Sequence, residues 1–319
     1  MTSNNGQQPL PTLHASAPPK TKWNFKRTWP LHIMLLPAFL LALIFNYGPM
    51  PGIIIAFQEY KPWLGIDGSA WAGFDQFRKM LEYPEVRRVI WNTFFIASLK
   101  IIFQLIVPII FALLLNEVRI SSLKRTVQTL VYLPHFLSWV ILGGILLDML
   151  SIEGGIVNNI LGSLFGINPI FFLGDGNWFR FTVVASDVWK DFGFSAIIFL
   201  AALSGINPEM YEAALIDGAH RFKQTLYITL PSLVPITIVV AVLSLGNVLN
   251  AGFDQIFNLY NPLVYSKGDI IDTYVYRQGL LGGQFSFATA VGLFKSVVAL
   301  VLILVGYRLA YKYADYRIF

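Results

Sequence analysis

Five ionisable residues lie within long apolar stretches of this sequence: Lys100, Asp187, Lys190, Asp191 and Lys295. A charge in such surroundings is costly, so it usually faces a cavity or a partner. These side chains therefore either pair between packed helices or line a path through the apolar region. The i,i+3 spacing predicts that Lys190 pairs with Asp187. Lysines on such a path would also suit a ligand that carries carboxylates.

Amide and aromatic side chains accompany these charges. Trp189 adjoins Lys190, and Asn247, Asn250, Asp254 and Gln255 follow a later apolar stretch. Hydrogen-bonding groups beside aromatic planes suit a polar ligand that also has apolar faces. The candidate pathway residues are Lys100, Asp187, Trp189, Lys190, Asn247 and Asn250.

Several kinds of chemistry are excluded by the sequence itself. It has no G-x-x-x-x-G-K-[ST] phosphate-binding loop, no H-E-x-x-H pair and no cysteine. The four histidines, His14, His32, His135 and His220, are scattered rather than clustered. We therefore expect no catalytic site, no metal site and no cofactor bound by this chain.

Residues 205–231 form a polar segment between two apolar stretches. Asn207 is a suitable N-cap and Pro208 suits the first helical position, which predicts a short helix over 208–216. Asp217 and Gly218 should end that helix, because glycine readily adopts backbone conformations that other residues resist. A second helix is expected from Arg221 to Leu230, followed by Pro231. The segment is predicted to be a helix–turn–helix at a membrane surface.

The composition of the whole chain indicates which elements position these residues. Of 319 residues, 55% are hydrophobic and only 13% are charged, whereas a soluble domain carries about 25% charged residues. A spanning helix needs about 20 mostly apolar residues, and six segments qualify. The predicted spans are about 30–48, 89–115, 127–149, 179–204, 231–252 and 288–308. The fold class is therefore an all-α membrane protein, with a transmembrane domain over 23–319.

Residues 1–22 are polar and proline-containing, so we expect a disordered cytoplasmic tail. With six spans both termini lie on one side of the membrane. Placing them inside gives the inner segments more lysine and arginine than the outer ones, which favours N-in/C-in. Arg87 and Arg88, next to the second span, argue against it. The net charge of +5 then reflects orientation in the bilayer, and no nucleic acid partner is expected.

The segment 205–231 resembles the EAA loop of ABC importer permeases. The family pattern is E-A-A, three residues, G, nine residues and I-x-L-P, and every fixed position is present. The matching residues are Glu212, Ala213, Ala214, Gly218, Ile228, Leu230 and Pro231, with Asp217 also matching the extended form. The resemblance implies a cytoplasmic coupling helix that docks on an ATPase, a type I importer permease fold and an N-in/C-in topology. The implied coupling residues are Glu212, Ala213, Ala214, Asp217 and Gly218.

The resemblance extends over residues 30–319. The stretches Tyr132–Trp139, Phe171–Asp175, Asn261–Tyr265, Asp272–Arg277 and Phe285–Lys295 are similar to carbohydrate permeases of the polysaccharide-uptake branch. Relatives in that branch import fragments such as rhamnogalacturonan and alginate oligosaccharides. The implied function is ATP-driven oligosaccharide import in a bacterial cytoplasmic membrane.

The resemblance also implies the partners. They are two ATPase subunits that bind ATP with Mg²⁺, a second and different permease subunit, and an external solute-binding protein. Two alternatives remain open from the sequence: an ABC permease for another solute such as peptides, and an ion-driven secondary transporter. The second would show inverted repeats with broken helices, and no such internal symmetry is visible.

Overall fold

The computed structural model describes residues 25–246 and 248–314, and the side chains of residues 28–246 and 248–308. The predicted tail, residues 1–22, lies outside this range. The chain divides into two compact units, residues 1–52 and 53–319.

The first unit holds α1 (Phe25–Ala42) and a π-helical turn, Leu43–Tyr47. A 3-10 helix, Met50–Phe57, continues into the second unit. The apolar helical stretch from Thr28 to Phe57 is 30 residues long and has no buried residue in its most apolar window. It contains the predicted span 30–48.

The second unit is helical apart from a two-stranded antiparallel sheet, β1 (Gln58–Glu59) with β2 (Ala70–Trp71). Its helices up to the coupling loop are α2 (Gly65–Gly68), α3 (Asp75–Glu82), α4 (Pro84–Glu117), α5 (Ser121–Tyr132), η3 (Leu133–Phe136), α6 (Trp139–Met149), α7 (Ile156–Phe165) and α8 (Gly176–Ser204). Those that follow are α9 (Pro208–Ile216), α10 (Arg221–Gln224), η4 (Thr225–Thr229), α11 (Leu230–Leu245), α12 (Phe253–Leu259), η5 (Pro262–Val264), α13 (Tyr265–Gly268), α14 (Ile271–Tyr276), η6 (Arg277–Leu281) and α15 (Phe285–Ala314).

Four helices in the described residues are long and apolar enough to cross a membrane: Thr28–Phe57, Pro84–Glu117, Arg221–Leu245 and Phe285–Arg308. The number rises to six if two bent pairs each count as one span. Their outward side chains are apolar, as with Leu114 (66% exposed) on α4 and Leu300 (57%) on α15. Side chains of this kind need lipid or another helix around them.

Two predicted spans differ from the observed helices. The segment 127–149 is not one helix, because α5–η3 and α6 meet at a bend of 103°. Pro134 and the N-cap Ser138, whose Oγ accepts the Ile141 N–H, mark the break. The predicted span 231–252 extends beyond the end of the observed helix, which begins at Arg221, the predicted start of the second loop helix, and ends at Leu245. No turn separates the second helix of the loop from the span.

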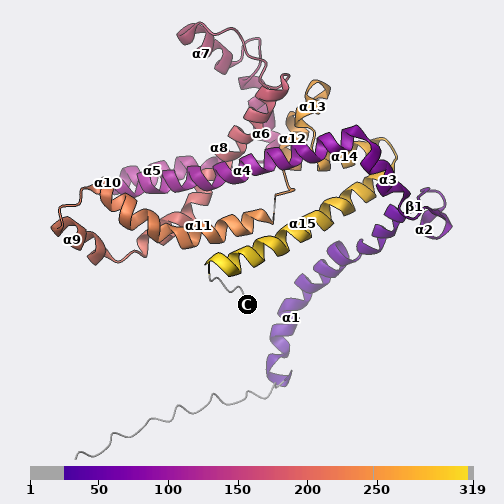
Figure 1. Ribbon diagram of the computed structural model, residues 1–319, viewed down its shortest axis with the longest axis horizontal. Coiled ribbons are helices and arrows are strands. Elements are labelled where there is room, and N and C mark those ends of the chain that lie inside the picture. Colours follow the sequence, from indigo (N-terminus) through magenta and orange to yellow (C-terminus); the bar gives the residue numbers. More distant parts are fainter. Residues whose placement is uncertain (1–24, 247, 315–319) are drawn as a thin grey trace, which may run out of the picture. The chain divides into compact units, whose positions relative to one another are not determined.

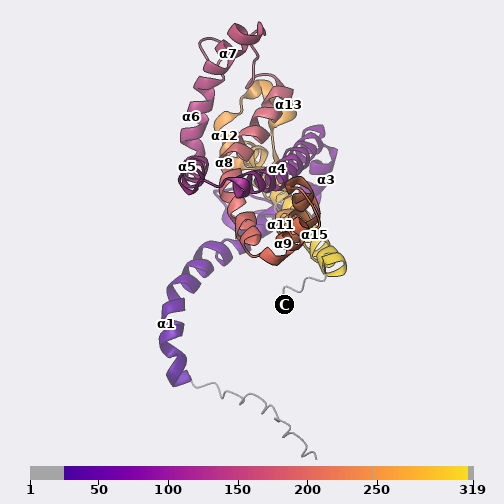
Figure 2. The same ribbon diagram turned by 90° about the vertical axis from the view of Figure 1, so that its left-hand side faces the viewer.

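Helices α4 and α8 form the most extensive helix–helix contact, and α11 packs against α15 (Figure 1). The main core lies where α4 and α8 meet α12, around Ile96, Phe179 and Ile256, all of them fully buried. Helix α9 and helix α3 lie at opposite ends of α4 in Figure 1, and Figure 2 views the second unit from the α9 end, nearly along α4. The second unit thus presents one end that carries the predicted coupling helix and another that carries the small sheet.

Candidate functional site

Helix α9 carries the residues of the predicted coupling loop. The Glu209 N–H donates to Asn207 Oδ1 at 3.1 Å, and Pro208 occupies the first helical position, so both predicted start signals are confirmed. The helix covers the nine predicted residues and buries none of them. Leu215 and Ile216 are 63% and 87% exposed. An apolar face of this kind is suited to contact with another protein.

A left-handed glycine ends α9. Gly218 has φ +73°, and the N–H groups of Gly218 and Ala219 donate to the carbonyls of Leu215 and Ala214. This is the usual way in which a helix terminates on glycine. A Cβ at Gly218 would meet nothing within 4 Å, so the backbone conformation rather than space requires glycine here.

Two contacts fasten α9 and its turn to the helices. The Tyr211 hydroxyl lies 2.9 Å from Thr229 Oγ1 in η4. The Arg221 guanidinium bonds to the carboxylate of Glu117, the last residue of α4. The first contact joins α9 to η4, and the second joins the start of α10 to the end of α4.

The second candidate site is a cavity of about 510 Å³ between α4, α8, η3 and α11. Its polar lining comprises Lys100, Gln104, His135, Asp187, Asp191, Ser195, Ser244 and Asn250. We call this set and the buried Lys190 and Gln255 behind it the polar cluster. It brings together four predicted pathway residues: Lys100, Asp187 and Asn250 in the lining and Lys190 just behind it. Asn247 lies outside the described residues.

Lys100 is the centre of one half of the polar cluster. Its Nζ donates to Asp187 Oδ1 at 2.8 Å, to the Ala251 carbonyl at 2.7 Å and to Gln255 Oε1. Gln255, fully buried in α12, donates in turn to the Val183 carbonyl at 2.7 Å. A buried ammonium is tolerated because every donor has an acceptor.

Gly252 makes this arrangement possible. It has φ +92°, and a Cβ built on it would lie 2.9 Å from Lys100 Nζ. Only glycine lets the backbone turn here and pass this close to the ammonium group. The turn presents the Ala251 carbonyl to Lys100 and begins α12.

The other half of the polar cluster joins α8 to η3. Lys190 Nζ donates to the His135 carbonyl at 2.7 Å and lies 3.7 Å from Asp191 Oδ1. His135 Nδ1 lies 2.7 Å from the same carboxylate, and its ring stacks on Phe194 at 4.1 Å. The predicted pairing of Lys190 with Asp187 is therefore wrong, because Asp187 faces α4 and Lys190 faces η3.

Close packing of α5 against α8 brings His135 to Asp191. A Cβ at Gly193 would lie 2.5 Å from the Val131 carbonyl, so a larger residue would push the two helices apart. The lysine side chains are more buried than the carboxylates. The exposed fraction is 7% for Lys100 and 10% for Lys190, compared with 17% for Asp187 and 31% for Asp191. The cavity presents carboxylates rather than free ammonium groups.

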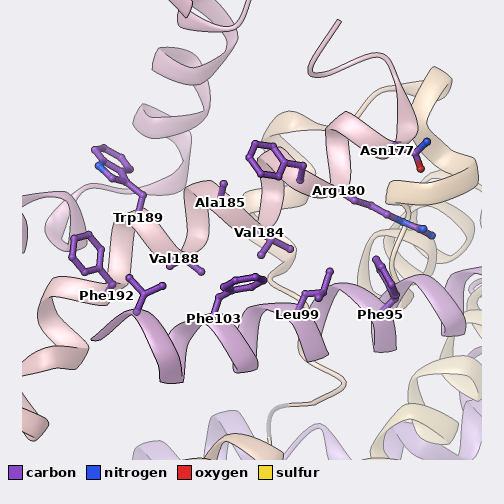
Figure 3. A pocket seen from close by; sticks show the side chains of 12 residues that line it. Phe95, Leu99, Phe103, Asn177, Arg180, Val184, Ala185, Val188, Trp189 and Phe192 are labelled. Atoms are coloured by element: carbon purple, nitrogen blue, oxygen red, sulfur yellow. The ribbon is translucent and has the colours of Figure 1, made fainter. Parts of the chain in front are cut away.

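Trp189 does not belong to this cavity. It lines a separate groove of about 600 Å³ between α4 and α8, with Phe103, Val188 and Phe192 (Figure 3). That groove is apolar except for Asn177 and Arg180 at one end. A site for sugar hydroxyls needs more hydrogen-bonding groups than this.

Sequence reasoning missed Gln104 and His135 as cavity residues. Gln104 lies one helical turn after Lys100, which was an available signal. Its Nε2 donates to the Asp187 carbonyl at 3.0 Å, and its buried Oε1 has no partner among the described residues. Nothing in the sequence predicted that His135 lines the cavity, because its position depends on the bend after η3. Lys295 lies apart from the polar cluster and pairs with Asp272 at 2.6 Å.

The chain is similar to transport proteins over nearly its whole length. The family described as binding-protein-dependent transport system inner membrane component matches residues 104–318. Protein LplB of Bacillus subtilis is 44% identical over 92% of each chain. The polygalacturonan/rhamnogalacturonan transport system permease protein YteP of the same species is 42% identical, covering 91% of this chain and 90% of YteP.

A solved structure shares the fold. It is the crystal structure of a bacterial ABC transporter involved in import of the acidic polysaccharide alginate. The matching chain has a TM-score of 0.82 and 42% identity, over 91% of this chain and 97% of that one. A second structure shows that transporter with an alginate pentasaccharide-bound periplasmic protein, with TM-score 0.82 and 41% identity, over 91% of this chain and 96% of that one. The chain therefore belongs to the binding-protein-dependent transport system inner membrane components, and it is a membrane permease subunit of an ABC importer, distinct from the ATPase and without enzymatic activity of its own.

Proposed function

We propose that this chain imports oligosaccharides by alternating access, driven by two separate ATPase subunits that bind ATP with Mg²⁺. A second, different permease completes the path, and an external solute-binding protein delivers the sugar. The chain crosses the bacterial cytoplasmic membrane six times with both termini inside. The relatives that transport polygalacturonan, rhamnogalacturonan or alginate support this substrate class.

The main observation behind this proposal is the exposure of helix α9. Its apolar face has no contact within the described chain that would bury it, and its turn is fastened to α4 and to the helix 221–245. Closure of an ATPase dimer against α9 would therefore move these helices as a rigid group. Such a step needs contacts that differ between the two states, and the bonds of Tyr211 and Arg221 are suited to transmit it.

The lining of the cavity offers hydrogen-bonding groups that suit sugar hydroxyls. The carboxylates of Asp187 and Asp191 and the unpartnered Gln104 Oε1 are all acceptors. Sugar hydroxyls can donate to each of them, and charge-assisted bonds to carboxylates are strong. Within the described part, each lysine of the polar cluster lies beside a carboxylate. The sequence-based hypothesis that these lysines select acidic substrates is therefore not part of the proposal.

The test separates coupling from folding. Glu212→Ala and Gly218→Val are made in the complete importer in proteoliposomes, with Glu153→Ala, an exposed acid before α7, as the control. We expect both loop variants to insert normally and to reduce sugar-stimulated ATP hydrolysis and uptake on the order of 10-fold or more, as for a lost coupling energy of 1–3 kcal/mol. Normal coupling in both would refute the proposal.

A further inference from the structure

A third pocket lies at the end of the second unit opposite to α9. It has a volume of about 380 Å³ and lies where β1, α3 and the start of α15 meet. Tyr83 in its lining directly precedes α4, whereas Glu117 ends α4 and contacts Arg221 within the coupling loop. The 34 residues of α4 put on the order of 50 Å between the two sites. We call it the outer pocket.

The walls of the outer pocket are fixed by packing. The Tyr60 N–H donates to Ser286 Oγ at 2.8 Å, which holds the end of β1 on the first turn of α15. The rings of Tyr60 and Phe285 meet edge to face at 6.1 Å, and those of Tyr83 and Phe287 lie 5.5 Å apart. The pocket therefore offers aromatic faces in a preformed position, which is typical of a small-molecule site.

A glutamine whose side chain is largely buried presents its accessible amide to this space. Gln76 on α3 lines the outer pocket and is only 6% exposed. Its side chain forms no hydrogen bond with any described residue. Because the rest of the side chain is buried, the amide group is the part that reaches the pocket. A ligand with hydroxyl or carbonyl oxygens would provide a hydrogen-bond partner.

The pocket also attracts negative charge. Lys61 and Lys79 line it, and neither forms an ion pair within the described residues. The N-terminus of the 30-residue helix α15 opens into it, and the N–H groups of Ser286 and Phe287 make no hydrogen bond in the described structure. Glu59 is the single carboxylate of the lining and leaves an excess of one positive charge. Free N–H groups at a helix start and unpaired lysines together bind carboxylates well.

We propose that the outer pocket binds a uronic acid residue of an oligosaccharide. The sugar's CH face lies on Tyr60, Tyr83 or Phe285, its carboxylate is held by Lys61, Lys79 and the start of α15, and a hydroxyl bonds to Gln76. This rests on the proposed function, which places α9 in the cytoplasm and the outer pocket outside. The lysines of the polar cluster are neutralised by carboxylates, so the outer pocket is where this chain distinguishes acidic from neutral sugars.

The test measures binding of a galacturonic acid trisaccharide and of its carboxyl-reduced counterpart to the assembled importer in nanodiscs, without the external binding protein. We expect the acidic sugar to bind at least 10-fold more tightly, and Lys61→Ala with Lys79→Ala to abolish this difference. Gln76→Leu should weaken both sugars. The control is Arg78→Ala with Arg87→Ala, which removes the same charge from exposed residues outside the lining.

Two results would overturn the proposal. One is unchanged binding of the acidic sugar in the double lysine variant. The other is a variant that weakens docking of the external binding protein while the trisaccharide binds normally, which would make the pocket a protein contact. Neither result bears on the coupling test, because that test changes Glu212 and Gly218 and leaves the outer pocket intact.

Discussion

The coupling helix α9 and the polar cluster are built in opposite ways. No residue of α9 is buried, and Ile216 is 87% exposed. In the polar cluster Lys100 is 6% exposed and donates to three acceptors. The conformation of the cluster is thus determined within the chain, whereas under the proposed function α9 is completed by the ATPase. Substitutions should therefore change stability in one region and association in the other.

Replacing Lys100 by methionine should have the largest effect on stability. It leaves Asp187 and the fully buried Gln255 without their donor. Removing one partner of a buried ion pair costs about 3–5 kcal/mol. We expect a clear drop in the thermal midpoint of the detergent-solubilised importer. Lys124→Met on α5 is the control.

The double variant Lys100→Met, Asp187→Asn sharpens this prediction. Removing the carboxylate together with the lysine eliminates the uncompensated charge. More than half of the lost stability should return. A double variant that is as unstable as Lys100→Met would show that the pairing is not what stabilises this region.

Replacing Tyr211 by phenylalanine should have a smaller effect. It removes the hydrogen bond to Thr229, which lies at 2.9 Å, and one such bond contributes about 1 kcal/mol. We expect a small change in the thermal midpoint but a reduced yield of sugar transported per ATP, because α9 is then held less firmly. Tyr227→Phe, an exposed tyrosine in η4, is the control. Equal transport yields in the two variants would contradict the role of Tyr211 in transmission.

The coupling loop could be predicted from the sequence because its signals are local. Asn207, Pro208 and Gly218 lie within or beside the helix that they delimit, and each acts through the backbone next to it. Such capping signals depend little on the rest of the fold.

The polar cluster could be predicted only in part. The free-energy cost of a charge in an apolar stretch identified Lys100 and Asp187 as candidates. The partner of a buried charge, however, is determined by packing. Lys100 and Gln255 are 155 residues apart in sequence, and helical spacing alone suggested the wrong partner for Lys190. The bend of 103° after η3 could not be predicted from the apolar pattern, because that pattern continues across it. The helix is interrupted by Pro134 at the start of η3 and by the N-cap Ser138 of α6.

Replacing Ile216 by alanine should have the smallest effect on stability and a large one on assembly. The side chain is 87% exposed, so the free energy of unfolding should change by no more than about 0.5 kcal/mol. An apolar residue at the centre of an interface can contribute about 2 kcal/mol or more to binding, so the ATPase should co-purify poorly. Ile160→Ala, an isoleucine on α7 that is 48% exposed, should change neither quantity. If Ile216→Ala lowered the thermal midpoint as much as Lys100→Met and left ATPase binding intact, the contrast between the two regions would be wrong, because α9 would then be stabilised by contacts within its own chain.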